Sequence, residues 1–277
     1  MSLSRVFIWL ARHGFPTEIK KSAFRKFCRR NRGLKMLTKC ESGHVMSVII
    51  GDSVDNQIGV YGIFEESATR VIMTLAGSSS AFIDIGCNIG YCSCLFAHQN
   101  PSKPLIAIDP NPLMVERTRE NLALNKATNA TMLDCGIGAE PGHLELHIPE
   151  NRHSLASFAY VPQRGGTSKS VTAKVTTLSQ ILADHPLNDV FVKIDTEGFE
   201  VNVFKGLKSD HFTNISYILF ELTGSNLEQA GHTPDELLTQ PVFKEFNLYL
   251  ITEDSSHPLS EIKNPSFTAE VNVNILM

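Results

Sequence analysis

The chain of 277 residues is long enough for one large domain, or for one domain with an extension, and can bury a substantial core. Its content of 42% hydrophobic and 19% charged residues is typical of a soluble globular protein, and no apolar run approaches the roughly 20 residues that cross a bilayer. We expect no signal peptide and six reduced cysteines, which together predict a cytoplasmic protein.

The net charge of −4 conceals a basic N-terminal segment. Residues 1–40 contain eleven Lys and Arg and a single acid, Glu18, whereas the remainder contains 14 basic and 28 acidic residues. Residues 19–37 place apolar side chains at helical spacing and predict an amphipathic helix. Two interpretations stay open. The helix packs its apolar side on the acidic body, or its basic side contacts an anionic membrane surface, a nucleotide-linked substrate or nucleic acid.

The segment after the basic arm predicts a small α+β extension. Residues 44–52 (HVMSVIIGD) alternate in polarity as a strand does, and residues 55–65 (DNQIGVYGIFE) are interpreted as a glycine-punctuated strand or turn region. Residues 65–77 (EESATRVIMTLAG) have helical spacing and end at a glycine. We therefore predict an arm and extension over residues 1–77 and a main domain over residues 78–277.

From residue 81 onwards, short apolar strands alternate with amphipathic helices. Such near-continuous apolar strands are typical of a parallel sheet that is covered on both faces. Residues 142–178 alternate in polarity without a clear helix and predict an antiparallel insertion, and two segments near the C-terminus predict the last strands, as a hairpin. The predicted fold is a doubly wound, mostly parallel α/β sheet. The predicted strands are 81–86, 104–109, 130–136, 189–195 and 216–222, and the predicted helices are 91–100, 112–125 and 199–207.

The turn after the first predicted strand, FIDIGCNIGY, predicts a ligand loop. It carries Asp84, Gly86, Asn88 and Gly90 where the strand leads into its helix. Glycines allow the backbone to approach a ligand, and the start of a helix offers unpaired N–H groups. The spacing is D-x-G-x-N-x-G and not the G-x-G-x-x-G of dinucleotide sites. A carboxylate at this turn would repel a diphosphate and attract a sulfonium or ammonium group, which favours S-adenosylmethionine over NAD.

Acids at the ends of the next two strands extend the predicted cofactor site. Asp109, followed by Asn111, is placed to accept hydrogen bonds from a ribose diol. Asp134, followed by Cys135, is placed to accept a hydrogen bond from an adenine amino group. Any one of these acids could instead cap the next helix. Their occurrence on three consecutive strands, together with the glycine loop, favours a nucleoside site.

The stretch FVKIDTEGFEV places three acids directly after a buried strand. Asp195 is the first candidate to contact the acceptor or the donor. Glu197 is the next, as a general base or as a partner of Lys193 or of an N-terminal arginine. Glu200 is expected to be structural, on the first turn of the following helix. His153, on a loop, is a further candidate for the general base. A divalent metal between Asp195 and Glu221 is left open but not favoured.

The ordered set of motifs resembles the FkbM family of S-adenosylmethionine-dependent methyltransferases. The resemblance covers residues 60–222 and is carried by FIDIGCNIGY, IAIDPNP, RENLALN, VKIDTEGFEVNVFKGL and ILFEL. It implies a Rossmann-like class I fold, S-adenosylmethionine as donor with S-adenosylhomocysteine as product, and a sugar or polyketide-type hydroxyl as acceptor. It also implies that Glu65 belongs to the cofactor site, because GIFE looks like the family's G-x-[FY]-E segment. Cys87 and Asp109 depart from the family's usual Ala and Glu.

We therefore predict O-methylation of a hydroxyl on a small-molecule or carbohydrate acceptor. Two alternatives stay open: a nucleic-acid or protein methyltransferase that the basic arm recruits, and a non-catalytic module that only binds the cofactor. Peripheral attachment to an anionic membrane surface and a homodimer are also left open.

Overall fold

A computed structural model describes residues 17–150, 153–159, 168–252, 259–263, 267 and 270–277, and the side chains from residue 23 onwards. An eight-stranded sheet forms its centre, in the order β12-β11-β13-β10-β9-β3-β4-β5. Strands β5, β4, β3, β9 and β10 run parallel, whereas β13 is antiparallel to β10 and to β11. The sheet strands are β3 (Ala81–Ile85), β4 (Leu105–Asp109), β5 (Ala130–Asp134), β9 (Val190–Ile194), β10 (Ile215–Thr223), β11 (Tyr249–Ile251), β12 (Leu259–Glu261) and β13 (Asn272–Leu276).

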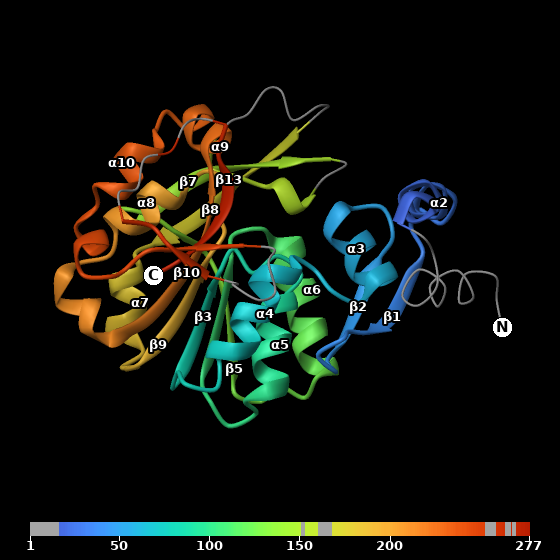
Figure 1. Cartoon of the computed structure of the whole chain (residues 1–277), viewed down its shortest axis with the longest axis horizontal. Coiled ribbons are helices and arrows are strands. Elements are labelled where there is room, and N and C mark those ends of the chain that lie inside the picture. Colours follow the sequence, from blue (N-terminus) through green and yellow to red (C-terminus); the bar gives the residue numbers. More distant parts are fainter. Residues whose placement is uncertain (1–16, 151–152, 160–167, 253–258, 264–266, 268–269) are drawn as a thin grey trace.

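Helices cover both faces of this sheet (Figure 1). One face packs against α4 (Glu66–Leu75), α5 (Tyr91–Gln99) and α6 (Pro112–Leu124), and the other against α7 (Leu178–Asp184), α8 (Glu200–Lys205) and α10 (Pro234–Leu238). Because side chains alternate along a strand, Phe82 and Phe191 enter the first core and Ile83 and Val192 the second. The predicted doubly wound α/β fold is therefore confirmed. The remaining short helices are η2 (Ser209–Asn214), α9 (Gly224–Gln229) and η3 (Pro241–Lys244).

The predicted antiparallel insertion is a separate three-stranded sheet in the order β6-β8-β7. Its long strands β7 (Gly142–Pro149) and β8 (Ser168–Thr176) pair antiparallel, and β6 (Gly136–Ile137) joins β8. A short helix, η1 (His153–Leu155), follows β7 and opens the segment 153–158, which lies beside the ends of the central strands.

The N-terminal part contains α2 (Thr17–Arg30), the hairpin of β1 (Lys35–Lys39) and β2 (Val45–Ile49), and α3 (Ser53–Tyr61). It docks on α6 through the buried ion pair of Arg117 and Asp55, at 2.5 Å. The described apolar side of α2 packs inward at Phe27, and the exposed side is basic, with Arg29 and Arg30. None of the helices in the described part of the chain combines the length and hydropathy needed to span a membrane.

Two local predictions in this part are wrong. The glycine-punctuated region is the helix α3, because Asp52 caps its start by accepting from the Val54 N–H, and Gly62 ends it with a left-handed φ of 76°. The basic helix ends at Arg30 and does not reach residue 37, because Gly33, with φ 83°, turns the chain into β1. Leu37 therefore lies on a strand and is 62% exposed.

Candidate active site

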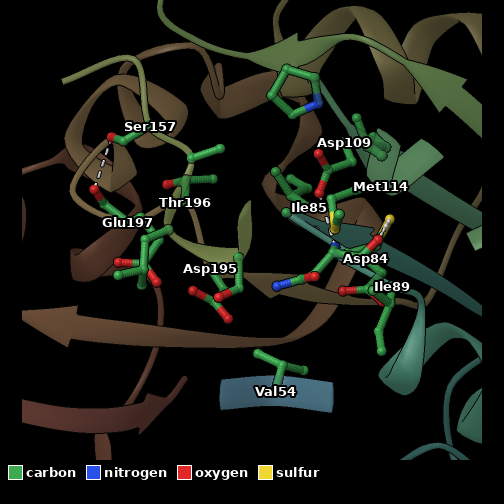
Figure 2. Close-up of a pocket in the computed structure, with 18 of the residues that line it drawn as sticks. Val54, Asp84, Ile85, Ile89, Asp109, Met114, Ser157, Asp195, Thr196 and Glu197 are labelled. Carbon is green, nitrogen blue, oxygen red and sulfur yellow. Dashed lines mark hydrogen bonds between the residues drawn. The ribbon is translucent and has the colours of Figure 1, made fainter. Parts of the chain in front are cut away.

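A pocket opens at the carboxyl ends of β3, β4, β9 and β10, where ligands bind in open α/β sheets (Figure 2). Its floor comes from the loops after these strands. One wall comes from the N-terminal part, through Val54 of α3 and Glu65 before α4. Another wall is the segment 153–158. Residues on both sides of the predicted boundary at position 77 thus line a single pocket, and the division of the chain at that position stays a prediction.

The glycine loop after β3 forms the part of the floor nearest to β9. Gly86 has φ 75°, and a Cβ at this position would stand 1.8 Å from the carbonyl oxygen of Asp195. Asn88 also has a positive φ, 53°, and lines the pocket. Gly90 begins α5 with its backbone against Thr118 and does not line the pocket. Of the predicted loop residues, Gly86 and Asn88 therefore reach the pocket, and Gly90 shapes the turn.

Asp84, the last polar residue of β3, is fully buried beneath the pocket. Its Oδ2 accepts a hydrogen bond from Ser93 Oγ at 2.6 Å, while its Oδ1 has no hydrogen-bond partner. Burial is the main reason that the pKa of Asp84 is raised, and the positive charge of Lys193 partly opposes it. A buried carboxylate oxygen without a partner at a pocket surface is a ready acceptor for a cationic ligand.

Asp109 ends β4 with both carboxylate oxygens fixed by the backbone. The N–H of Asn88 donates to its Oδ2 at 2.9 Å, and the N–H of Asn111 donates to its Oδ1 at 2.8 Å. Burial raises the pKa of Asp109 to about 7. Each carboxylate oxygen can accept a second hydrogen bond, so the pair remains available to a diol. Asn111 does not line the pocket; its own side chain caps α6.

Of the two site residues predicted at the end of β5, one lines the pocket and the other does not. Cys135 is buried and lines the pocket, next to the apolar Ile137. The side chain of Asp134 is exposed and is not part of the pocket lining. The backbone turns after Asp134, so that the strand's last acid points to solvent.

The acids after β9 have separate environments. Asp195 accepts a hydrogen bond from Lys193 Nζ at 3.0 Å, and its backbone N–H donates to the Ile85 carbonyl. Lys193 therefore pairs with Asp195, because residues two apart on a strand share a face, whereas Glu197 itself has a left-handed φ of 55°. Glu197 accepts from Asn226 Nδ2 at 3.0 Å, and both acids line the pocket.

Glu200 has the structural role that the sequence predicts. Its buried carboxylate accepts hydrogen bonds from the N–H and Oγ1 of Thr196 and from the N–H of Gly198, at 2.9–3.2 Å. These bonds hold the turn that presents Glu197. Glu200 does not line the pocket.

Three hydrogen bonds hold the segment 153–158 against residues around the pocket. Asn111 Nδ2 donates to the His153 carbonyl at 3.5 Å, the Ser154 N–H donates to Asp52 at 3.4 Å, and Ser157 Oγ donates to the Glu197 carbonyl at 3.0 Å (Figure 2). His153 lines the pocket, with its buried Nδ1 unpartnered. The side chain predicted as a loop base thus faces the same pocket as the acids.

Several lining residues are not predicted as site residues from the sequence. Lys193 is expected only as a partner of Glu197, and Val54 belongs to the helix α3, where the sequence predicts strand or turn. Glu221 is expected only in connection with a metal. It follows Phe220 on β10, whose register partner is Ile194, and this brings it beside Asp195. Alternation along DVFVKID already places Lys193 on the side of Asp195, and this signal could have identified the pair.

The unpartnered polar atoms test whether the pocket suits S-adenosylmethionine. Asp84 Oδ1, Asn88 Oδ1, His153 Nδ1 and Ser154 Oγ are buried without hydrogen-bond partners, and all four residues line the pocket. Apolar side chains lie near the ends of β4 and β5 beside Asp109, and most of the carboxylates lie near the ends of β3, β9 and β10. This division fits a ligand with an apolar base, a diol and a cationic end. Among the described residues, no three His, Cys, Asp or Glu side chains are arranged to hold a metal ion.

Comparisons with known proteins agree with this geometry. The Methyltransferase FkbM domain matches residues 84–251. "Methyltransferase sdnD" of Sordaria araneosa is 26% identical over 172 residues, 52% of this chain and 66% of the relative. "Methyltransferase 1" of Beauveria bassiana (strain ARSEF 2860) is 26% identical over 166 residues, 53% of this chain and 66% of the relative. The chain thus spans just under two thirds of the length of these relatives.

Solved structures with a similar fold include a putative methyltransferase from Streptococcus mutans in complex with SAH, with a TM-score of 0.41, 8% identity and coverage of 77% of this chain and 98% of that one. A SAM-dependent O-methyltransferase from Thermotoga maritima has a TM-score of 0.39, 12% identity and coverage of 88% and 77%. The family match extends over more than half of the chain and includes the glycine loop and every acid at the strand ends. This protein belongs to the FkbM family of S-adenosylmethionine-dependent methyltransferases, with the class I fold.

Proposed function

We propose that this protein transfers a methyl group from S-adenosylmethionine to a hydroxyl group of an uncharged small-molecule or carbohydrate acceptor. The observation that carries the proposal is the charge of the pocket lining. Six carboxylates line it, from Glu65, Asp84, Asp109, Asp195, Glu197 and Glu221, against one lysine and no arginine among the described residues. Carboxylates accept hydrogen bonds from hydroxyl groups and repel phosphates, sulfates and other carboxylates.

The donor end of the pocket is supported by the residues of β3 and β4. Asp84, Gly86, Asn88 and Asp109 would hold S-adenosylmethionine, through the unpartnered oxygens and the fixed carboxylate described above. When bound, S-adenosylmethionine supplies a methyl group that is already activated as a sulfonium. The protein's own contribution is then proximity and orientation, which can lower a barrier by about 7–11 kcal/mol.

The acceptor end is supported by the residues that follow β9. A hydroxyl group must lose its proton as it attacks, so a base within hydrogen-bond reach is required. Asp195 and Glu197 are both presented there, Asp195 by its bond to Lys193 and Glu197 by Asn226 and by the turn that Glu200 holds. We assign removal of this proton to the pair, with Glu197 as the general base and Asp195 as the group that orients the acceptor hydroxyl. His153, across the pocket, is the alternative base.

The basic side of α2 is the observation that favours the second candidate, a nucleic-acid methyltransferase. Arg29 and Arg30 are exposed there, and such residues attract phosphates. The acidic lining of the pocket opposes this candidate, because a polyanionic acceptor would have to bring its phosphates towards carboxylates.

Transfer of labelled methyl from S-adenosylmethionine to two acceptor panels tests the proposal. One panel holds neutral sugars, polyols and phenols, and the other holds RNA and DNA. We expect transfer to the neutral panel and a loss of at least about 100-fold in Glu197→Gln, the lower range for a general base. The exposed Glu145→Gln is the matched control. Transfer to nucleic acid alone would contradict the proposal.

A further inference from the structure

Four carboxylates and one lysine gather on the face of the sheet that α4 and α5 cover. Asp84 of β3 is the direct register partner of Lys193 on β9. Asp195 is two residues further along the same strand, and Glu221 lies beside it at the end of β10. Glu65 reaches them from the start of α4, where its backbone has φ 43°. We call Glu65, Asp84, Asp195 and Glu221 the acid cluster.

The four carboxyl groups of the acid cluster have a single neighbouring cation, Lys193, among the pocket-lining residues. Lys193 is buried, and its Nζ donates a hydrogen bond to Asp195 at 3.0 Å. Asp84 receives a hydrogen bond from Ser93 on one oxygen, and its other oxygen is buried at the pocket without a partner. A fully buried carboxylate oxygen without a partner is costly unless a ligand supplies the missing donor or positive charge.

The surplus of acids leads to proton binding near neutral pH. Burial and the charges of Asp195 and Asp84 raise the pKa of Glu65 to about 7, although Lys193 opposes them. For Glu221, burial and the charges of Asp195, Glu65, Glu197 and Glu200 raise the pKa to about 9. The cluster therefore carries protons that an added positive charge would expel, since a nearby cation favours the ionised carboxylate.

We propose that the acid cluster recognises the charge of the donor, so that the pocket binds cationic S-adenosylmethionine with release of protons and prefers it to S-adenosylhomocysteine, which lacks the sulfonium charge. The inference rests on the proposed donor and adds a specificity that the fold alone does not require. The same property favours dissociation of the product S-adenosylhomocysteine, because the acid cluster binds protons again once the sulfonium charge is lost.

Titration calorimetry in two buffers of different ionisation enthalpy, at pH 6.8, counts the protons released by each ligand. This pH lies below the ordinary pKa of an α-amino group, about 7.7–8.0, so the ligands' own amines contribute little. We expect S-adenosylmethionine, and the charged analogue sinefungin, to release more protons than S-adenosylhomocysteine and to bind more tightly. The difference belongs to the charge and not to the methyl group if sinefungin behaves like the donor.

Variants of the acid cluster then identify the carboxyl groups that release these protons. Glu65→Gln and Glu221→Gln should each reduce the difference in proton release, and the double variant should abolish it and narrow the preference for the donor by about tenfold, the factor for one pKa unit. Glu145→Gln, exposed on β7, should leave both unchanged. Melting temperatures without ligand verify that each variant folds.

The outcomes separate this inference from the proposed function. If both ligands bind and release equal numbers of protons, or if the double variant retains the difference, the charge-recognition proposal is overturned while the donor site stands. If neither ligand binds the wild-type protein, both proposals are overturned.

Discussion

The α-carbon of Gly86 lies against the carbonyl oxygen of Asp195, and a Cβ built on Gly86 would stand 1.8 Å from that oxygen. This contact joins the loop after β3, at the proposed donor end of the pocket, to the turn after β9, at the proposed acceptor end. The N–H of Asp195 also donates to the Ile85 carbonyl at 3.0 Å. The two ends of the pocket are therefore fixed to each other by backbone and not by flexible side chains.

Gly86→Ala tests this contact. The added methyl group cannot fit without moving the backbone of Asp195, and the φ of 75° is also unfavourable for alanine. We expect S-adenosylhomocysteine affinity to fall at least about tenfold, the equivalent of ~1.4 kcal/mol, in a titration. Gly142→Ala is the control, because a Cβ there would meet no atom within 4 Å. Equal binding by both variants would contradict the close packing of the two ends.

The strands and turns around the contact of Gly86 with Asp195 are predicted correctly from the sequence. The apolar runs and the glycines predict the strands and the turns, because alternation and backbone freedom are local properties. Asp195, Glu197 and His153 are brought together at one pocket, as their positions after strands and on a loop suggest. The same reasoning fails for Asp134. The direction of a side chain at the end of a strand depends on the turn that follows, and no local sequence pattern specifies that turn.

The rest of the pocket depends on contacts between segments distant in sequence. Val54 lines it in part because Arg117 of α6 holds Asp55 of α3, sixty-two residues away in the sequence. The prediction of strand or turn for α3 is wrong because Gly59 lies inside a helix that Asp52 and Gly62 cap. Likewise, the pKa of Glu221 is raised mainly by burial and further by the charges of Asp195 and Glu65. Asp195 is its neighbour because β9 and β10 are adjacent in the sheet.

Removing Lys193 should destabilise the protein strongly. Lys193→Met leaves Asp195 and Asp84 without their nearest cation, and breaking a buried pair in this way costs about 3–5 kcal/mol. Urea denaturation measures this loss. The double variant Lys193→Met/Asp195→Asn should recover part of it, because the unpaired charge is also removed. A double variant as unstable as the sum of the single changes would show that the two residues do not interact.

Asp109 should impose a pH dependence on stability. Its pKa is raised from 3.8 to about 7 on folding, so between these values the folded protein holds a proton that the unfolded chain has lost. This contribution to stability is fully present below pH 3.8 and is lost as the pH rises to about 7, with a slope of at most ~1.4 kcal/mol per pH unit.

Urea denaturation of wild type and Asp109→Asn across pH 4.5–7.5 measures this contribution as the difference between the two curves. The stability of the wild type relative to the variant should fall as the pH rises and level off above about 7. A difference that stays constant over this range would exclude the raised pKa.

The exposed basic side of α2 should bind polyanions in a manner that depends on salt. We expect vesicles with anionic lipid to retain the protein at low ionic strength, and Arg29→Ser/Arg30→Ser to weaken this retention. Lys205→Ser, at a partly exposed lysine of α8 on the other face of the sheet, is the control for loss of a positive charge elsewhere on the surface. Retention of wild type and double variant to the same extent would exclude a role of these arginines in surface contact.

Titration of S-adenosylhomocysteine into the wild type and into Asp84→Asn, Asp109→Asn and Asp134→Asn tests whether the donor binds in this pocket. We expect one binding site per chain. We expect affinity losses of at least about tenfold for the first two variants, whose carboxylates face the pocket, and a far smaller loss for the exposed Asp134. Absence of binding at millimolar ligand, or an equal loss in Asp134→Asn and Asp109→Asn, would contradict the placement of the donor in this pocket.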